Sequence, residues 1–281
     1  GFEAANAALL SSITINQRSK LTYTHYSHQL ASLSLYYQAL PCALSQAQID
    51  AYLVYVLERT EGKSMTTYKQ TVYAIMYYYK RVVRLPCPHL PRVIQRYGIP
   101  VVLSEDECRR LFKAPTFLKH RVVLTLIYSG GFRVSEAANL KIEDLDFDRK
   151  IINIRNGKGL KDRCVPLSDV LVKGLKKYFN EFKPKTFVFN SKKPGTGLPY
   201  SGRSMQALMQ LALKKAAIDK TATLHSLRHS FATHSLENGI NIVTVQALMG
   251  HTKIQTTMVY LQLLSRDTKA VKSPLDTLYT K

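Results

Sequence analysis

Apolar residues recur every three or four positions along most of the chain, which is the spacing of amphipathic helices. Near the N-terminus such stripes run through residues 23–37, 49–57 and 65–79. Ser45 and Gln48 stand ahead of the second stripe with the spacing of a capping box, in which each side chain bonds to the backbone of the other residue. The pattern predicts a small, all-helical domain in this part of the chain.

A proline-rich segment separates these helices from the rest of the chain. LPCPHLPRVIQRYGIP, residues 85–100, contains four prolines. Proline removes a backbone donor and disfavours helix in the residue before it, so this segment is predicted to be an extended linker. A second capping box, Ser104 with Glu107, then marks the first helix of another domain.

The second domain combines helical stripes with one region of strand character. RVVLTLIYSG, residues 121–130, predicts a helix, and after the turn GGFR we expect Ser135 to cap the next one. IINI and RCVPL flank a Gly-Lys-Gly turn, which predicts two strands of a hairpin. The fold class is therefore mainly α, in the α+β sense, with a small antiparallel sheet.

The charge of the chain indicates a polyanionic partner. Lys and Arg together number 40 against 19 Asp and Glu, a formal net charge of +21. Such an imbalance makes a compact chain repel itself, and it is typical of proteins that bind nucleic acid. The basic residues are spread along the sequence rather than gathered on one amphipathic helix, which argues against membrane binding. The plainer alternative is a basic protein that its charge keeps soluble.

The cysteines and the apolar segments argue against other classes. The four cysteines, at positions 42, 87, 108 and 164, form no CxxC pair, so the sequence predicts neither a zinc site nor a disulfide framework. No apolar run approaches the ~18–20 residues that span a bilayer, and the N-terminal segment lacks the basic region of a signal peptide. We expect a cytoplasmic, prokaryotic, nucleoid-associated protein with reduced cysteines and no membrane partner.

Several residues have the chemistry that covalent cleavage of a phosphodiester requires. Such a reaction needs a nucleophile, donors for the non-bridging oxygens and an acid for the leaving oxygen. His225 and Arg228 lie three apart on one predicted helix, where both side chains reach a common point. Arg133 stands in a glycine-flanked turn before a helix, and Lys158 stands at the tip of the predicted hairpin. Arginine suits the donor role because its planar fork matches phosphate oxygens.

Each of these residues also has an ordinary interpretation. An isolated His-x-x-Arg pair usually lies on a solvated helix face, as would His229 and His234 beside it. Lys158 alone is typical of an exposed hairpin tip, and Tyr260 in TTMVYLQLL would by default be a core tyrosine. The order and context of the residues, rather than any one of them, favour catalysis.

Four segments together resemble the tyrosine recombinases, or phage integrase family, which includes the Xer proteins and the integron integrases. SGGFRVSEAANL is similar to the family's first arginine box, and NGKGLKDRCVPL to its lysine hairpin. LHSLRHSFATHSLENG resembles its His-x-x-Arg box, and MGHTKIQTTMVY its closing segment from Gly-His to Tyr. The resemblance covers nearly the whole chain and is strongest over residues 101–262.

The resemblance implies a role for each matching residue. Tyr260 is the implied nucleophile, which forms a 3′-phosphotyrosyl link and frees a 5′-hydroxyl. Arg133 and Arg228 would bind the scissile phosphate. The other implied members are His251, which donates a hydrogen bond to the phosphate; Lys158, the acid for the 5′ oxygen; His225, which assists proton transfer at the tyrosine; and Glu136, which orients Arg133. The family needs neither metal nor ATP, so we expect no cofactor.

The resemblance also implies domains and partners. Residues 1–84 resemble the family's helical, SAM-like core-binding domain, with residues 1–15 expected to be flexible. Residues 85–100 would form the linker, 101–262 the catalytic domain, and 263–281 a tail that docks on a neighbouring subunit or packs on its own domain. The expected partners are double-stranded DNA recombination sites and further copies of the chain in a homo-tetramer. The basic residues expected to contact DNA phosphates are Lys63, Lys69, Lys80, Arg81, Arg84, Arg92 and Arg96.

Two departures from the family pattern bear on the biological role. Met249 replaces the more usual leucine before Gly-His, a near-isosteric change. Leu261 and Gln262 follow the tyrosine where many Xer-like members have Thr-His, which favours a mobile-element integrase over a housekeeping Xer protein.

Two other functions are compatible with parts of the sequence. A type IB topoisomerase shares the tyrosine chemistry, but the core-binding domain and the tail argue against it. A DNA-binding protein of the same fold that no longer cuts is the other alternative, although all six implied catalytic positions are intact.

Overall fold

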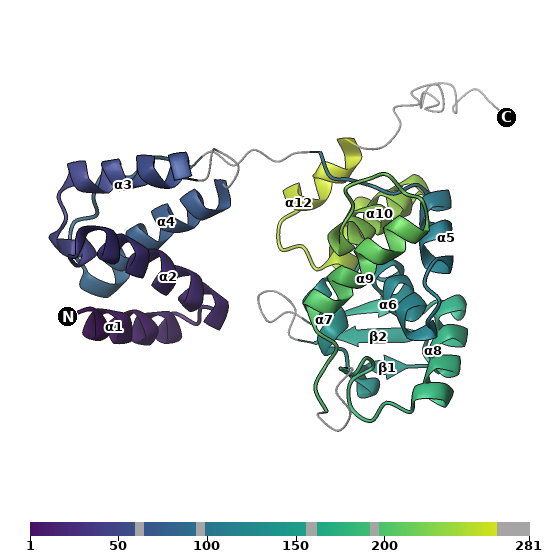
Figure 1. The fold of residues 1–281 in the computed structure, drawn as a ribbon. Helices are drawn as coiled ribbons and strands as arrows, with labels where there is room; N and C mark the ends of the chain where they lie inside the picture. The colour runs from purple at the N-terminus through teal and green to yellow at the C-terminus, as the bar shows by residue number, and fades with distance from the viewer. Residues whose placement is uncertain (60–64, 94–98, 156–161, 192–196, 263–281) are drawn as a thin grey trace. The chain divides into compact units, whose positions relative to one another are not determined.

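The chain divides into two compact units, Gly1–Tyr97 and Gly98–Lys281 (Figure 1). Each has a hydrophobic core of its own. The division falls within the proline-rich segment 85–100. The computed structural model describes residues 1–59, 65–93, 99–155, 162–191 and 197–262.

The described part of the first unit is all helical. Its elements are α1 (Phe2–Ile15), α2 (Lys20–Tyr37), the 3₁₀ turn η1 (Pro41–Ala43), α3 (Gln46–Arg59), α4 (Met65–Tyr77) and the π-helical turn η2 (Tyr78–Val83). α2 packs on α1 and α4, and α3 packs on α4, with Leu33, Ile49 and Val72 fully buried between them. The first capping box is confirmed, because the Ser45 N–H donates to Gln48 Oε1 at 2.9 Å and the Gln48 N–H to Ser45 Oγ at 3.3 Å.

Helix α1 corrects the expectation that residues 1–15 are flexible. Leu9 and Ile13, four residues apart, are buried in the core of the unit. The Asn6 side chain donates to the Tyr23 hydroxyl at 2.9 Å and accepts from Ser27 Oγ at 2.7 Å, both on α2. Alanine and serine surround the apolar positions of α1, so its buried face does not stand out in the sequence.

The second unit is built around helix α6. Its helices are α5 (Glu105–Lys113), α6 (Leu118–Ser129), α7 (Val134–Asn139), η3 (Ile142–Asp144), α8 (Asp169–Phe182), α9 (Gly202–Lys215), α10 (Leu224–Glu237), α11 (Ile242–Met249), α12 (Gln255–Met258) and η4 (Val259–Gln262). α6 packs against α5, α7, α8, α9 and α10. Val123, Leu124 and Ile127 on α6 are fully buried, which explains the apolar run that predicted this helix.

A small antiparallel sheet lies in the second unit (Figure 1). Its order is β1 (Leu145–Asp146), β2 (Ile151–Ile154), β3 (Arg163–Pro166). Ile152 pairs with Val165, and both are buried. The predicted pairing of IINI with RCVPL is confirmed, whereas the two-residue strand β1 had no strand signal of its own.

The helix starts of the second unit support one capping prediction and correct another. The Glu107 N–H donates to Ser104 Oγ at 3.2 Å and the Ser104 N–H to Glu107 Oε2 at 2.7 Å, which confirms that capping box. Ser135 does not cap α7, because the helix begins at Val134 and Ser135 lies inside it. Arg133 is the N-cap residue instead, and its backbone N–H donates to the Glu136 carboxylate at 2.8 Å.

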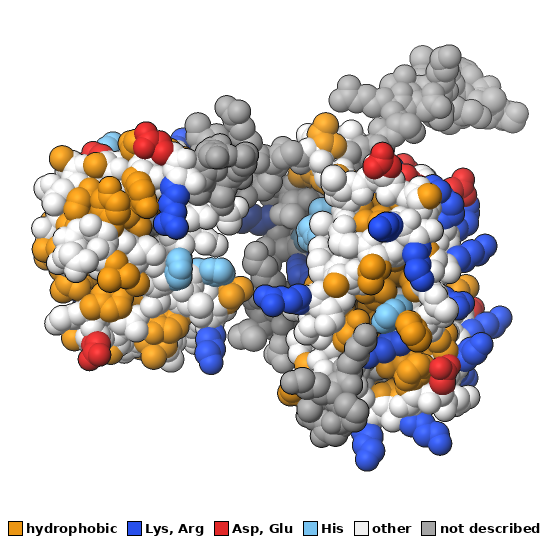
Figure 2. All heavy atoms as spheres, viewed as in Figure 1, with side chains coloured by type: hydrophobic (Ala, Val, Ile, Leu, Met, Phe, Trp, Pro, Cys, Tyr) orange, Lys and Arg blue, Asp and Glu red, His pale blue; other side chains and the backbone are white. Residues whose placement is uncertain are grey.

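Basic side chains are prominent on the second unit. Figure 2 shows Lys and Arg around much of its visible surface, with acidic side chains at few places. Of the helices in the described ranges, none combines the length and the apolarity that crossing a membrane requires.

Candidate active site

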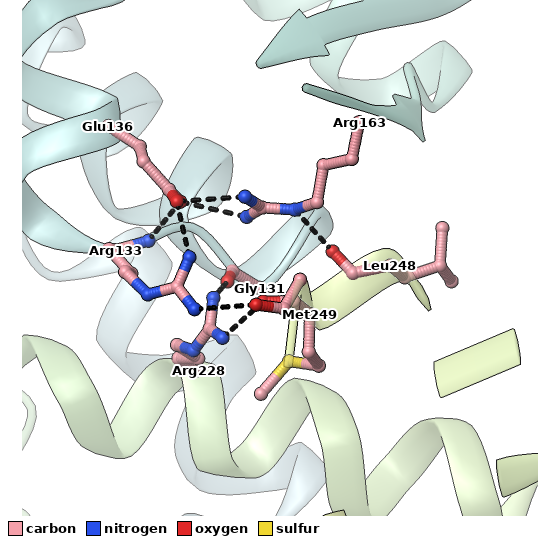
Figure 3. A network of polar contacts seen from close by, with 8 residues as sticks. Gly131, Arg133, Glu136, Arg163, Arg228, Leu248 and Met249 are labelled. Carbon is pink, nitrogen blue, oxygen red and sulfur yellow. Dashed lines mark hydrogen bonds and ion pairs between the residues drawn. The ribbon is translucent and has the colours of Figure 1, made fainter. Parts of the chain in front are cut away.

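Three arginines from separate elements meet at the C-terminal end of helix α11 (Figure 3). Arg133 precedes α7, Arg163 begins β3, and Arg228 lies on α10. Each donates to a different backbone carbonyl: Arg163 Nε to Leu248 at 2.7 Å, Arg228 Nη2 to Met249, and Arg133 Nη2 to Gly250 at 2.9 Å. The last carbonyls of a helix lack intrahelical partners and carry the negative end of its dipole, so this end stabilises the three cations.

Glu136 joins two of these arginines. Its Oε1 accepts from Arg133 Nη1 at 2.6 Å and from Arg163 Nη1 at 2.8 Å, and its Oε2 accepts from Arg163 Nη2 at 2.8 Å. The side chains of Glu136 and Arg163 are 7% and 8% exposed. Burial alone would raise the pKa of Glu136, but the hydrogen bonds and charges of Arg163 and Arg133 hold that pKa at about 2. Glu136 is therefore an ionised carboxylate that fixes the direction of the Arg133 side chain.

Arg228 is the most deeply buried member of the cluster. Only 1% of its surface is exposed, its Nη1 donates to the Gly131 carbonyl, and its Nε has no hydrogen-bond partner among the described residues. Burial and the neighbouring charge of Arg133 lower the pKa of Arg228 to about 9, so it still carries its charge at neutral pH. A buried guanidinium with a spare donor favours an anionic ligand.

Two glycines in left-handed conformations allow the chain to approach the arginines. Gly131 has φ +58°, and a Cβ there would lie 2.6 Å from the Phe231 ring. Gly250 has φ +61° and ends α11, with its carbonyl turned to Arg133. These conformations are costly for other residues, so the glycines are required by the geometry of the site.

Tyr260 lies in η4, after α12, and is only 3% exposed. It packs with Val245 and Met249, and its hydroxyl is 2.9 Å from His229 Nδ1. Burial raises the pKa of Tyr260, and the charges of Arg228 and Arg133 lower it only in part. The phenol is therefore protonated at neutral pH and lies within the field of two cations.

Two further histidines lie close to this tyrosine. His251 follows Gly250, shares a hydrogen bond with Thr257 Oγ1 at 2.9 Å, and stacks on the Tyr260 ring with centroids 6.3 Å apart. Burial and then the charges of the arginines lower the pKa of His251 to about 3. His225 is exposed in the first turn of α10, and partial loss of hydration and the charges of Arg228 and Arg133 lower its pKa.

Comparison with known proteins identifies the family. Residues 101–266 match the model of the phage integrase family. A putative integrase/recombinase, y4qK, of Sinorhizobium fredii is 31% identical and covers 92% of this chain and 83% of its own length. The chain belongs to the phage integrase family. The tyrosine recombinase XerA of Pyrococcus furiosus is likewise 31% identical, over 92% of this chain and 88% of its own length.

Solved structures of family members have the same fold. A XerA recombinase matches with a TM-score of 0.55 and 27% identity, over 99% of this chain and 98% of that one. A XerH site-specific recombinase bound to its difH substrate after cleavage matches with a TM-score of 0.72 and 19% identity, over 92% of this chain and 81% of that one. Together with the named relatives, these findings show that the chain is a tyrosine-type site-specific DNA recombinase.

The structure of this recombinase brings together five of the six implied catalytic residues. Arg133, His225, Arg228, His251 and Tyr260 lie in one unit, linked by contacts or by their mutual charges. The sixth, Lys158, lies outside the described residues, as do Lys63, Arg96 and the tail 263–281. Of the other basic residues expected on DNA, Lys80, Arg81, Arg84 and Arg92 are exposed, and Lys69 is half-buried with its Nζ 5.8 Å from the centre of the Tyr73 ring.

Sequence reasoning missed two residues of the site. Arg163 was part of the hairpin box, but the alternation of β3 places it on the same face as the buried Val165, which was a usable signal. His229 lies one turn after His225 on α10, and by residue type its ordinary interpretation is a surface histidine. His234, interpreted in the same way, is buried and shares a hydrogen bond with the Tyr128 hydroxyl at 2.9 Å.

Proposed function

We propose that this recombinase cuts and rejoins DNA strands through a covalent 3′-phosphotyrosyl intermediate at Tyr260. The observation that supports this most is the uncompensated positive charge beside the buried phenol. The cluster contains the guanidinium groups of Arg133, Arg163 and Arg228 against the one carboxylate of Glu136 within the described residues. A phosphodiester supplies one of the two missing negative charges and an acceptor for the Nε of Arg228, which has no partner among the described residues.

The two arginines that flank the proposed phosphate position act by electrostatic stabilisation. Arg133 and Arg228 keep their bonds to the end of α11, which fixes their planes before DNA arrives. Their remaining N–H groups donate to the non-bridging oxygens, where charge increases as the phenol attacks. Because the donors are already in place, little reorganisation is needed during the reaction.

Three other residues complete the proposed chemistry. The neutral imidazole of His251 donates a hydrogen bond to the phosphate, next to Arg133 and Arg228. Lys158 protonates the departing 5′ oxygen from the hairpin between β2 and β3. His225, at the exposed start of α10, assists proton transfer at Tyr260. The phosphotyrosine keeps the energy of the broken phosphodiester, so we propose that the reaction needs neither metal nor ATP.

We also propose that the two units, joined by residues 85–100, act on double-stranded DNA as a tetramer that pairs two recombination sites. Residues 1–84 would form the core-binding domain, 101–262 the catalytic domain, and 263–281 the docking tail. The solved neighbours include XerH on a difH substrate and a Tn1549 transposon integrase with DNA, which supports DNA as the partner. Leu261 and Gln262, together with relatives named putative integrase/recombinase, favour a mobile element.

Covalent trapping tests this function. The protein is mixed with fragments of its source genome that carry random nicks, so that the freed strand end diffuses away and the intermediate persists. After denaturation, the DNA that stays attached is sequenced. We expect attachment at discrete sites, and none with Tyr260→Phe at equal DNA binding.

Two other results would reject the proposal. Attachment scattered over the library without site preference indicates a topoisomerase. Site-selective binding without attachment at any site, with both possible nick positions represented, indicates a DNA-binding protein that does not cut.

A further inference from the structure

The hydroxyl of Tyr260 is hydrogen-bonded to a residue that the family resemblance did not assign. Its partner is His229 Nδ1, at 2.9 Å, and the two rings are 5.5 Å apart between centroids. The ring of His225 packs edge-on against that of His229 instead, with the two centroids 4.4 Å apart. Of these two histidines on α10, it is therefore His229 that directly contacts the reacting oxygen.

The surroundings of His229 favour a neutral ring that can accept a proton. Burial, and then the charges of His225 and Arg228 on the same helix, lower its pKa to about 4. Among the described elements that pack on α10, η4 places Tyr260 against His229, and His251 stacks on Tyr260. Tyr128 of α6 bonds to His234 and not to His229. A neutral His229 whose ring proton is on Nε2 presents an unprotonated Nδ1 to the phenol.

We propose that His229 is the base that removes the proton of Tyr260 during strand cleavage and returns it during rejoining, so that His225 assists this transfer through its contact with His229; this rests on the proposed function. As the Tyr260 oxygen bonds to phosphorus, its proton passes to Nδ1, and His229 becomes an imidazolium. The bond from phosphorus to the 5′ oxygen breaks with its electron pair, and that oxygen takes a proton from the acid, proposed above as Lys158. Rejoining runs these transfers in reverse, so no proton is lost over the cycle.

DNA binding brings His229 closer to the requirements of a base. A general base is most effective when its pKa is near the working pH. The cations that lower the pKa of His229 include Arg228, which the scissile phosphate would partly neutralise. We therefore expect the pKa of His229 to rise when DNA binds, in step with the arrival of the substrate.

The variant His229→Asn separates a base from a packing residue. The Asn Oδ1 lies near the place of Nδ1 and still accepts a hydrogen bond from the phenol, but it cannot take the proton. We expect single-turnover cleavage of a nicked substrate from the trapping experiment to fall about 100-fold or more, with DNA binding unchanged. The rate of the variant should also rise steadily with pH between pH 6 and pH 9, where the rate of the parent levels off.

His234→Asn is a matched control. His234 lies on the same helix, is buried, and contacts the hydroxyl of Tyr128, rather than that of Tyr260, through Nδ1 at the same 2.9 Å. We expect this variant to cleave within threefold of the parent rate and to keep the parent pH profile. Equal effects of the two substitutions would mean that His229 only packs against the tyrosine, which overturns the proposal.

Two chemical substitutions distinguish the base from the acid. A substrate with sulfur in place of the bridging 5′ oxygen has a leaving group that needs no acid, so it should rescue Lys158→Ala and leave His229→Asn slow. Replacing Tyr260 by a difluorotyrosine, whose phenol is more acidic, should rescue His229→Asn and leave Lys158→Ala slow. Rescue of His229→Asn by the sulfur substrate would assign it to the acid and reject the proposal.

A measurement on the parent protein applies even if His229→Asn fails to fold. Deuterium exchange at the C2 carbon of histidines, followed by mass spectrometry, gives the pKa of His229 with and without DNA. A rise on binding supports the proposal, and an unchanged or lower pKa rejects it. Attachment of Tyr260→Phe to DNA would instead reject the proposed function itself, so the two failures are distinguishable.

Discussion

The contribution of Glu136 to stability should depend on pH in a way that its ion pairs define. The pKa of this carboxyl is about 2 in the folded chain against an ordinary value of 4.5. A group whose pKa is lower in the folded state stabilises the fold at pH above both values, and this stabilisation is lost as the pH falls through the folded pKa. At 1.36 kcal/mol for each pKa unit, the difference of about 2.5 corresponds to about 3 kcal/mol at neutral pH.

The substitution Glu136→Gln removes this contribution while it keeps the size of the side chain. We expect the free energy of unfolding of the catalytic unit to fall by about 3 kcal/mol at pH 7, because Arg133 and Arg163 lose their shared counter-ion. At pH 3 the difference between parent and variant should shrink to about 1 kcal/mol, because the carboxyl of the unfolded parent is then mostly protonated.

Methionine oxidation in urea measures this unit separately from the N-terminal one. Met205 and Met209 on α9 are fully buried in the core of the second unit, so hydrogen peroxide oxidises them only after that unit unfolds. The extent of oxidation at increasing urea concentrations, determined by mass spectrometry, gives the unfolding midpoint at each pH.

The matched control is Glu105→Gln, since Glu105 forms an exposed ion pair with Arg109 on α5. Exposed pairs of this kind contribute about 0–1 kcal/mol, so this variant should change little at either pH. A difference between parent and Glu136→Gln that stays the same from pH 7 to pH 3 would refute the assignment of a depressed pKa to Glu136.

Three further predictions concern single features of the molecule. Arg228→Lys should reduce single-turnover cleavage by more than about 100-fold, because one ammonium cannot hold two carbonyls and a phosphate together; cleavage within tenfold of the parent rate would contradict this. Gly131→Ala should lower the free energy of unfolding by about 2 kcal/mol in the methionine assay, because of its positive φ and the contact with Phe231; unchanged midpoints would contradict it. The double variant Arg81→Gln, Arg84→Gln should reduce the slope of the logarithm of the DNA-binding constant against the logarithm of salt concentration by about 2, because each arginine is expected to contact one phosphate. Fluorescence anisotropy measures this slope, and an unchanged slope would remove both residues from the DNA interface.

Local patterns predicted much of the fold. The capping boxes at Ser45 and Ser104 and the pairing of IINI with RCVPL depend on interactions within a few residues or between adjacent strands, which the spacing of residue types reveals. Strand β1 has only two residues and forms because β2 lies beside it. Helix α1 is held by contacts with α2, and its own sequence gives little sign of a buried face.

The site was predictable as a set of residues but not as a geometry. The four boxes indicated which side chains meet, whereas the use of three consecutive carbonyls at the end of α11, Leu248 to the C-cap Gly250, by three arginines depends on tertiary packing. The same holds for His229, which became distinct from the other histidines only through its contact with the Tyr260 hydroxyl. Ser135 is a reasonable cap by residue type, but α7 begins one residue before it, with Arg133 at the N-cap position.

The covalent intermediate is tested most directly by identifying the protein atom that becomes linked to DNA. Trapped complexes are digested with nuclease and protease, and the peptide that retains a nucleotide is sequenced by mass spectrometry, while the freed strand is tested for a 5′-hydroxyl by labelling with polynucleotide kinase. We predict that Tyr260, among the 17 tyrosines of the chain, carries the nucleotide through its 3′ phosphate, and that the freed strand accepts the label directly. A nucleotide on any other residue, or a freed strand that must be dephosphorylated before it accepts the label, would contradict this prediction.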